Sequence, residues 1–154
     1  MTTAPSQPEL ELEFPPKPEY VRMVRLAAGA LARLHGVGED TVEDIKLAVS
    51  EASTRAVAAN AEHGRGQQVR LDAFVDGPSM LVEVQDAGPS PEREVRGDPE
   101  ELDTDELPFD QALAVPLIRG LVDELTIGLV EGGGTRLRMA ISLEPKPDPE
   151  PGEA

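Results

Sequence analysis

The hydrophobic period of this sequence changes along the chain in an order that few folds can accommodate. Residues 9–14 alternate polar and apolar side chains, which predicts a strand with one buried face. Two helical patterns follow at residues 19–35 and 40–60, where apolar side chains recur every three or four positions. Alternation returns at residues 68–75 and 79–86. The Asp-Gly-Pro sequence between these two segments favours a hairpin turn.

The C-terminal part of the chain repeats the change of period. A helix is predicted at residues 110–121 and two closing strands at 125–130 and 136–143, joined by a glycine-rich turn. Residues 87–108 form a long, acidic, proline-containing segment, and such segments are usually lids, binding loops or disordered. The whole order predicts an α+β fold: a two-layer α/β sandwich with a mixed, mostly antiparallel sheet covered by helices on one face.

Composition limits the remaining possibilities. The 154 residues suit one domain, with a disordered N-terminus at 1–8, a folded domain at 9–143 and a disordered acidic, proline-rich tail at 144–154. The chain has no cysteine, no signal peptide and no apolar run long enough for a membrane helix, which favours the cytoplasm. A net charge of −16 argues against direct binding of nucleic acid or anionic membranes. This negative charge is interpreted either as favouring a basic protein partner or as serving solubility alone.

Four stretches in this order resemble a known family. They are FPPKPEYVR at 14–22, DIKLAVSEASTRAV at 44–57, VEVQDAGPS at 82–90, and LAVPLIRGLVDEL at 113–125 followed by Gly-Gly-Thr. Together they resemble the anti-sigma-factor and serine/threonine-kinase branch of the GHKL ATPases, which have the histidine kinase-like (Bergerat) fold. The resemblance covers roughly residues 9–143. It implies that fold, ATP with Mg²⁺ as cofactor, and a sigma factor and an anti-sigma antagonist as partners; members commonly form homodimers.

The second-helix signature of that family holds a catalytic Glu and, four positions later, an Asn that ligates Mg²⁺. Glu51 matches the Glu, whereas Arg55 stands at the Asn position. A guanidinium has no acceptor atom and carries a permanent positive charge, so it cannot ligate Mg²⁺. The spacing instead predicts an ion pair between Arg55 and Glu51, and an ordinary solvated helix pair is the alternative interpretation. Asn60 lies on another part of the helix circumference and is not expected to replace the missing Asn.

The other implied nucleotide contacts are partly kept. Asp86 matches the residue that accepts from the adenine amino group, Gly88 matches a glycine of the same box, and Thr135 matches a Thr near the base. The alternative for residues 86–89 is a common turn at a strand end. Three departures stand beside these matches, because Ser90, Ala112 and Ala114 occupy positions where the family has glycines. Alanine does not readily adopt the left-handed backbone that glycine allows, so a close wrap around a triphosphate is not expected.

No other chemistry competes with this site. His35 and His63 each lie near a turn, where capping or solvation is the expected role, and no metal site is predicted. Three functions remain. The first is an anti-sigma-type regulatory protein with nucleotide binding weakened or lost. The second is an active ATP-dependent kinase that phosphorylates an anti-sigma antagonist. The third is a scaffold or dimer partner unrelated to transcription.

Overall fold

The structure, a computed structural model, describes residues 7–64, 66–88, 109–130 and 133–145. Five strands form one sheet in the order β1-β2-β3-β5-β4, and every pairing of neighbours is antiparallel. The strands are β1 (Leu10–Phe14), β2 (Val69–Asp76), β3 (Ser79–Asp86), β4 (Glu124–Leu129) and β5 (Thr135–Ser142). The helices are α1 (Glu19–Leu34), α2 (Glu39–Glu62) and α4 (Phe109–Leu121). The predicted fold class and element order are confirmed, with each bound within two residues of its predicted place.

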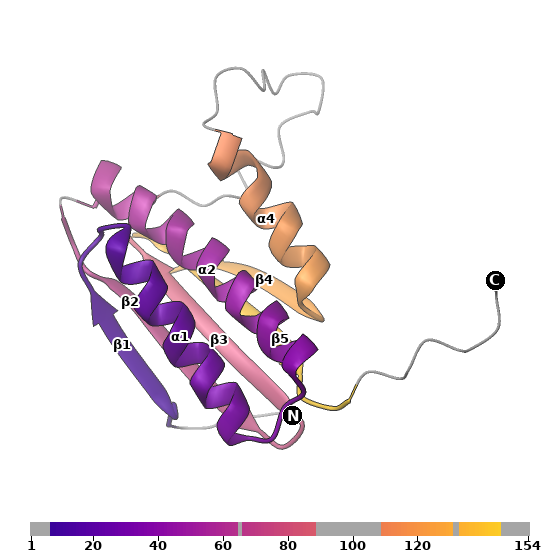
Figure 1. The fold of residues 1–154 in the computed structure, drawn as a ribbon. Coiled ribbons are helices and arrows are strands. Elements are labelled where there is room, and N and C mark those ends of the chain that lie inside the picture. The colour runs from indigo at the N-terminus through magenta and orange to yellow at the C-terminus, as the bar shows by residue number, and fades with distance from the viewer. Residues whose placement is uncertain (1–6, 65, 89–108, 131–132, 146–154) are drawn as a thin grey trace.

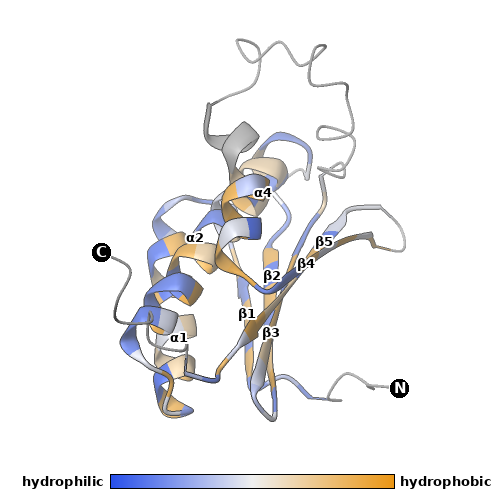
Figure 2. Cartoon of the chain, turned by 90° about the vertical axis from the view of Figure 1, so that its right-hand side faces the viewer, coloured by the Kyte–Doolittle hydropathy of each residue, from blue (hydrophilic) through white to orange (hydrophobic). Residues whose placement is uncertain are grey.

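The helices form one layer on the sheet. Figure 1 shows α1 and α2 running side by side over the sheet, with α4 on the other side of α2. Figure 2 views the two layers from the side, with the helices along one face of the strands. The expected lid at 87–108 lies outside the described residues from 89 onward, as do residues 1–6 and 146–154 of the expected terminal segments.

The end of α1 shows why the chain turns where it does. The N–H of Gly36 donates to the carbonyl of Arg33, and the N–H of Val37 donates to the carbonyl of Ala32. These two bonds define a Schellman motif, which needs a left-handed residue after the helix. Gly36 supplies it with a φ of 72°. The buried side chain of Val37 then fixes the direction in which the chain enters α2.

The core lies between the helical layer and the sheet. It is built from aliphatic and sulfur-containing side chains with a single buried aromatic residue, Phe14, among the described residues. Alanines at 48, 52 and 56 recur along α2 and are all buried. Because these side chains are small, α2 packs closely against both its helical neighbours and the central strand β3.

The opposite face of the sheet is charged. Arg70 on β2 bonds Asp72 at 2.9 Å and lies within 3.6 Å of Glu11 and Glu13 on β1. The hydrogen bond to Asp72 raises the pKa of the Arg70 guanidinium above its ordinary value. The contacts with Glu11 and Glu13 join β1 to β2 on the face that the helices leave open. No helix in the described part of the chain has the length and apolar character needed to cross a membrane.

Candidate functional site

A buried ion pair joins the middle of α2 to the end of β3. The Nη1 of Arg55 donates to the Oδ2 of Asp86 at 2.8 Å, across 31 positions of sequence. Arg55 is 9% exposed and Asp86 is 7% exposed. Two opposite charges held together in a site of low dielectric interact more strongly than a surface pair, but each has lost its hydration. The pair therefore fixes α2 relative to the carboxyl end of β3.

The second oxygen of Asp86 is also engaged. The N–H of Gly88 donates to Oδ1 at 2.7 Å, which closes a tight turn after the strand. The hydroxyl of Thr135, the first residue of β5, donates to the carbonyl of Gly88 at 3.0 Å. The structure thus brings together the four residues at positions assigned to the cofactor site, Arg55, Asp86, Gly88 and Thr135, in one buried hydrogen-bonded cluster.

Two glycines allow the backbone segments of this cluster to approach one another. A Cβ on Gly88 would lie 2.7 Å from the Cβ of Ala59, so only glycine lets the turn pass against α2. A Cβ on Gly134 would lie 2.4 Å from the carbonyl oxygen of Asp86, and its φ of +110° is one that other residues rarely adopt. Gly88 therefore makes room for α2 at the end of β3.

Asn60 ties the same region together from the last turns of α2. Its Nδ2 donates to the carbonyls of Gln67 at 2.9 Å and Gln68 at 3.2 Å, just before β2. Its Oδ1 accepts from the N–H of Ala87 at 2.6 Å, just after β3. The side chain is 1% exposed. The side-chain oxygen of Asn60 is thus engaged by the backbone at the end of β3.

Glu51 lies one helical turn before Arg55 on α2 and is partly exposed. The sequence spacing predicted that it would pair with Arg55. That prediction is corrected by the structure, because the ion pair that it shows for Arg55 runs to Asp86. The reason is geometric. The helix turns Arg55 toward the sheet, where a buried carboxylate is available, while Glu51 stays nearer the surface.

The residues present do not fit Mg²⁺-ATP as the family resemblance describes it. Arg55 brings five donors and a positive charge to a position that needs an oxygen ligand. Both carboxylate oxygens of Asp86 already accept hydrogen bonds, from Arg55 and Gly88. An adenine amino group would have to compete with a charge-assisted bond, which is roughly twice as strong as a neutral one.

The positions expected to contact phosphates are helical or lie outside the described residues. Ser90 belongs to the latter. Ala112 and Ala114 both fall within α4, and Ala114 is 2% exposed. Both alanines therefore lie in a continuous helix. His35 and His63 are the C-cap residues of α1 and α2, as their positions near turns predicted. In the described ranges, no group of three or more potential ligands is placed to hold a metal ion.

Two features of the site escaped sequence reasoning. The partner of Arg55 was misassigned because i, i+4 spacing is visible in a sequence and a contact across 31 positions is not. The clamp made by Asn60 was also missed. A signal for it was present, since a short amide side chain stands just before the His-Gly turn that ends α2, where backbone groups need partners.

With this geometry in place, comparison with known proteins identifies the class. Residues 14–141 match the sequence profile of the histidine kinase-like ATPase domain, and the chain belongs to that family. Its relatives narrow the class further, because they are serine-protein kinases named RsbW. The predicted resemblance to the anti-sigma-factor and serine-kinase branch is confirmed.

The extent of similarity differs between relatives. The protein from Bacillus licheniformis is 40% identical over 79 residues, and the match spans only 49% of each chain. The chain therefore aligns with about half the length of that relative. The protein from Listeria innocua is 30% identical over 128 residues, which cover 80% of this chain and 82% of the relative.

Solved structures agree with the fold. The RsbU and RsbW domains of a Mycobacterium tuberculosis protein align with a TM-score of 0.65 at 20% identity, covering 91% of this chain and 33% of that one. A chain of the SiaB-SiaC complex from Pseudomonas aeruginosa aligns with a TM-score of 0.62 at 12% identity, covering 88% and 90%. At these identities the likeness establishes the shared architecture alone.

Proposed function

We propose that this protein is an anti-sigma-type regulatory protein that binds a sigma factor, its anti-sigma antagonist, or both, and in which nucleotide binding is weakened or lost. Membership of the family and the RsbW relatives support the regulatory class. The SiaB-SiaC complex adds that a chain of this architecture occurs in a complex between proteins. The particular partners rest on the resemblance, since fold alone does not define function.

The buried pair between Arg55 and Asp86 is the observation that carries the nucleotide part of the proposal. Adenine recognition of the family type would require Asp86 to accept from a neutral amino group in place of a guanidinium. Displacing the guanidinium would leave a buried cation without this carboxylate, which is costly. The free energy of that rearrangement is subtracted from the free energy of adenine binding. Each increment of about 1.4 kcal/mol in this cost weakens the apparent affinity tenfold.

Metal binding is opposed at the same place. Family-type phosphoryl transfer depends on a metal ion and on positioning of the phosphates. Arg55 contributes a fixed positive charge where Mg²⁺ would need an oxygen ligand. Arg55 thus disfavours both adenine binding at Asp86 and Mg²⁺ binding at its own position.

The second candidate is an active ATP-dependent serine/threonine kinase that phosphorylates an anti-sigma antagonist. It is favoured by the kinase names of the relatives and by Glu51, which stands partly exposed on α2 at the position of the family's catalytic Glu. It predicts Mg²⁺-dependent ATP binding and phosphate transfer, both lost in Glu51→Ala. The scaffold hypothesis gains no specific support from the structure.

Calorimetric titration with ATP, with and without Mg²⁺, separates the two candidates. We expect no binding to the unmodified chain and Mg²⁺-dependent binding to Arg55→Asn, which removes the cation and supplies an amide oxygen. Lys46→Asn is the matched control, because it removes one positive charge from the same helix outside the cluster. Micromolar Mg²⁺-ATP binding by the unmodified chain would refute the nucleotide part of the proposal and move the kinase assay to first place.

The partner half is tested separately by affinity purification of the chain from its own cells. Recovery of a sigma factor or an antagonist is the expected result, and recovery of neither, with the bait folded and at natural abundance, counts against the proposal. Sedimentation of the purified chain tests the homodimer that the resemblance predicts.

A further inference from the structure

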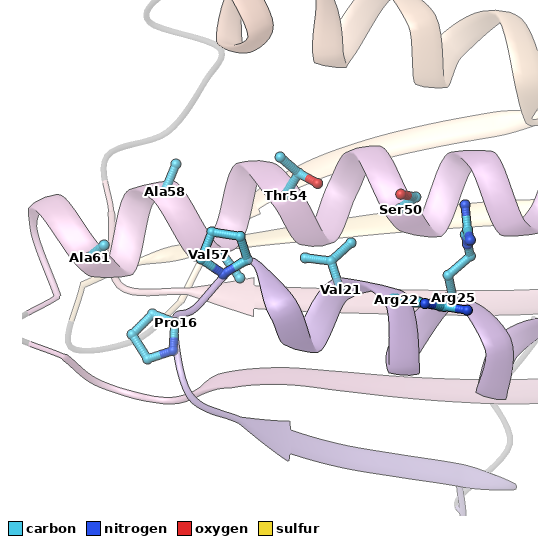
Figure 3. Close-up of a pocket in the computed structure, with 10 residues that line it drawn as sticks. Pro16, Val21, Arg22, Arg25, Ser50, Thr54, Val57, Ala58 and Ala61 are labelled. Carbon is cyan, nitrogen blue, oxygen red and sulfur yellow. The ribbon is translucent and has the colours of Figure 1, made fainter.

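A groove of about 470 Å³ lies between α1 and α2, beside the chain that leads from β1 into α1. Figure 3 shows it with α2 along one side and the start of α1 along the other. Its floor is largely apolar and includes Val57, Ala58 and Ala61 of α2, together with Val21 of α1 and Pro16. Small side chains on the floor let another backbone approach closely. This groove is separate from the buried cluster around Asp86, whose residues do not line it.

Two arginines one helical turn apart, Arg22 and Arg25, form the wall that α1 contributes. Neither has an ion pair with any residue that the structure describes. Arg22 is exposed, and the Nε of Arg25 is buried without a hydrogen-bond partner among the described residues. A buried donor with no acceptor is costly, and a carboxylate bound to the same guanidinium would offset part of that cost.

The lack of carboxylate partners is notable in a chain of this composition. Acidic residues outnumber basic ones 30 to 14, and the arginines at positions 33, 55, 70, 136 and 138 each pair with at least one carboxylate. The groove is thus a local basic site on an acidic protein. On the opposite side of the groove, Ser50 and Thr54 of α2 offer hydroxyl groups in place of charge.

We propose that this groove docks an acidic segment of a protein partner, with an apolar side chain on the floor and carboxylates on Arg22 and Arg25. Guanidinium groups bind carboxylates in a two-point, oriented geometry, which suits this wall. The apolar floor favours a peptide over a phosphate backbone, and the net charge of −16 repels nucleic acid. The inference deepens the proposed function, since it rests on the protein having a protein partner, but it requires no nucleotide and no particular sigma factor.

The test selects random short peptides on the folded full-length chain and compares their binding with that to Arg22→Glu/Arg25→Glu. We expect the selected peptides to place two or more carboxylates near an apolar residue, and to bind the double variant at least about tenfold more weakly. Arg33→Glu/Arg119→Glu is the control. It makes the same change of net charge at two exposed arginines outside the groove, and binding should be kept.

A second pair of variants tests the floor. Ala58→Glu places a carboxylate in the groove and should abolish binding, whereas Ala30→Glu on the exposed side of α1 should not. The inference is overturned if the selected peptides carry no excess of acidic residues, or bind the arginine double variant as well as the original chain. A concentration-dependent dimer that both groove variants abolish would also overturn it, since the occupant would then be a second copy. The selection uses random peptides and involves neither a sigma factor nor ATP. Its failure can therefore be distinguished from failure of the purification and ATP tests of the proposed function.

Discussion

Replacing Arg55 by methionine should strongly destabilise the fold. Methionine keeps the length and apolar stem of the side chain but removes the guanidinium, so the change isolates the ion pair. The Asp86 side chain is 2% exposed, and the substitution removes the guanidinium that donates to its carboxylate at this buried site. Breaking a buried pair in this way typically costs about 3–5 kcal/mol. That is a large share of the roughly 5–15 kcal/mol that stabilises most domains.

The double variant Arg55→Met/Asp86→Asn separates the energy of the pair from that of packing. Asparagine removes the negative charge and can still accept from the N–H of Gly88 through its amide oxygen. Exchanging both members of a buried pair for neutral groups is often close to neutral. We therefore expect the double variant to recover most of the loss, with a coupling energy of about 2–3 kcal/mol.

Urea unfolding of the four proteins in the cycle, followed by circular dichroism, gives the required free energies. Arg33→Met is the control, because Arg33 pairs with Glu39 at the surface and its loss should not shift the midpoint measurably. The reasoning fails if Arg55→Met costs less than about 1 kcal/mol, or if the two single losses simply add. Either result would mean that the two charges are hydrated and not paired in the interior.

Other predictions follow from the same cluster and from the surface. Asn60→Ala should destabilise the fold by about 2–4 kcal/mol in urea unfolding, since it removes three hydrogen bonds that join α2 to the ends of β2 and β3. Gly88→Ala should cost about 1–3 kcal/mol by overpacking against α2. Ala59→Gly should partly rescue it, and no rescue would contradict the contact. The hydrogen bond from Arg33 holds the pKa of Glu39 below its ordinary value. The small contribution of this surface pair to stability is therefore present above the pKa of Glu39 in the unfolded chain. It is lost as the pH falls through the lower pKa of Glu39 in the folded protein. An NMR titration should show the Glu39 pKa rising in Arg33→Gln.

The fold was readable from the sequence because its elements are local patterns. Alternation in β3 and the Asp-Gly turn before it fix a hairpin, and the predicted residues 79–86 are those observed. Boundaries shifted where end turns depend on tertiary contacts. For example, α2 runs on to Glu62, two residues beyond its predicted end, and the last turns are held by the bonds of Asn60.

The candidate site could be predicted only in part from the sequence. The motifs identified Asp86, Gly88 and Thr135, and the structure brings them together. What each of them contacts could not be predicted. The partner of Arg55 depends on which way α2 faces the sheet, and that orientation is set by packing of the whole core. The groove beside Arg25 was missed for a similar reason, because it exists only where two helices and the incoming chain meet. The sequence motifs therefore identified the residues of the site but not the contacts that these residues make with one another.

The sheet order also bears on how the chain folds. Strands β2 and β3 are joined by a two-residue turn and can pair early, because little chain entropy is lost in closing so short a loop. Among the strands that the structure describes, β1 pairs with β2 alone, and both α1 and α2 lie between these two strands in sequence. The β1–β2 pairing is a long-range contact, and the entropy of closing the long loop between the two strands must be lost before the pairing stabilises the fold. We therefore expect β1 to be among the last strands to dock, which leaves the outer edge of β2 transiently available to other chains until β1 covers it.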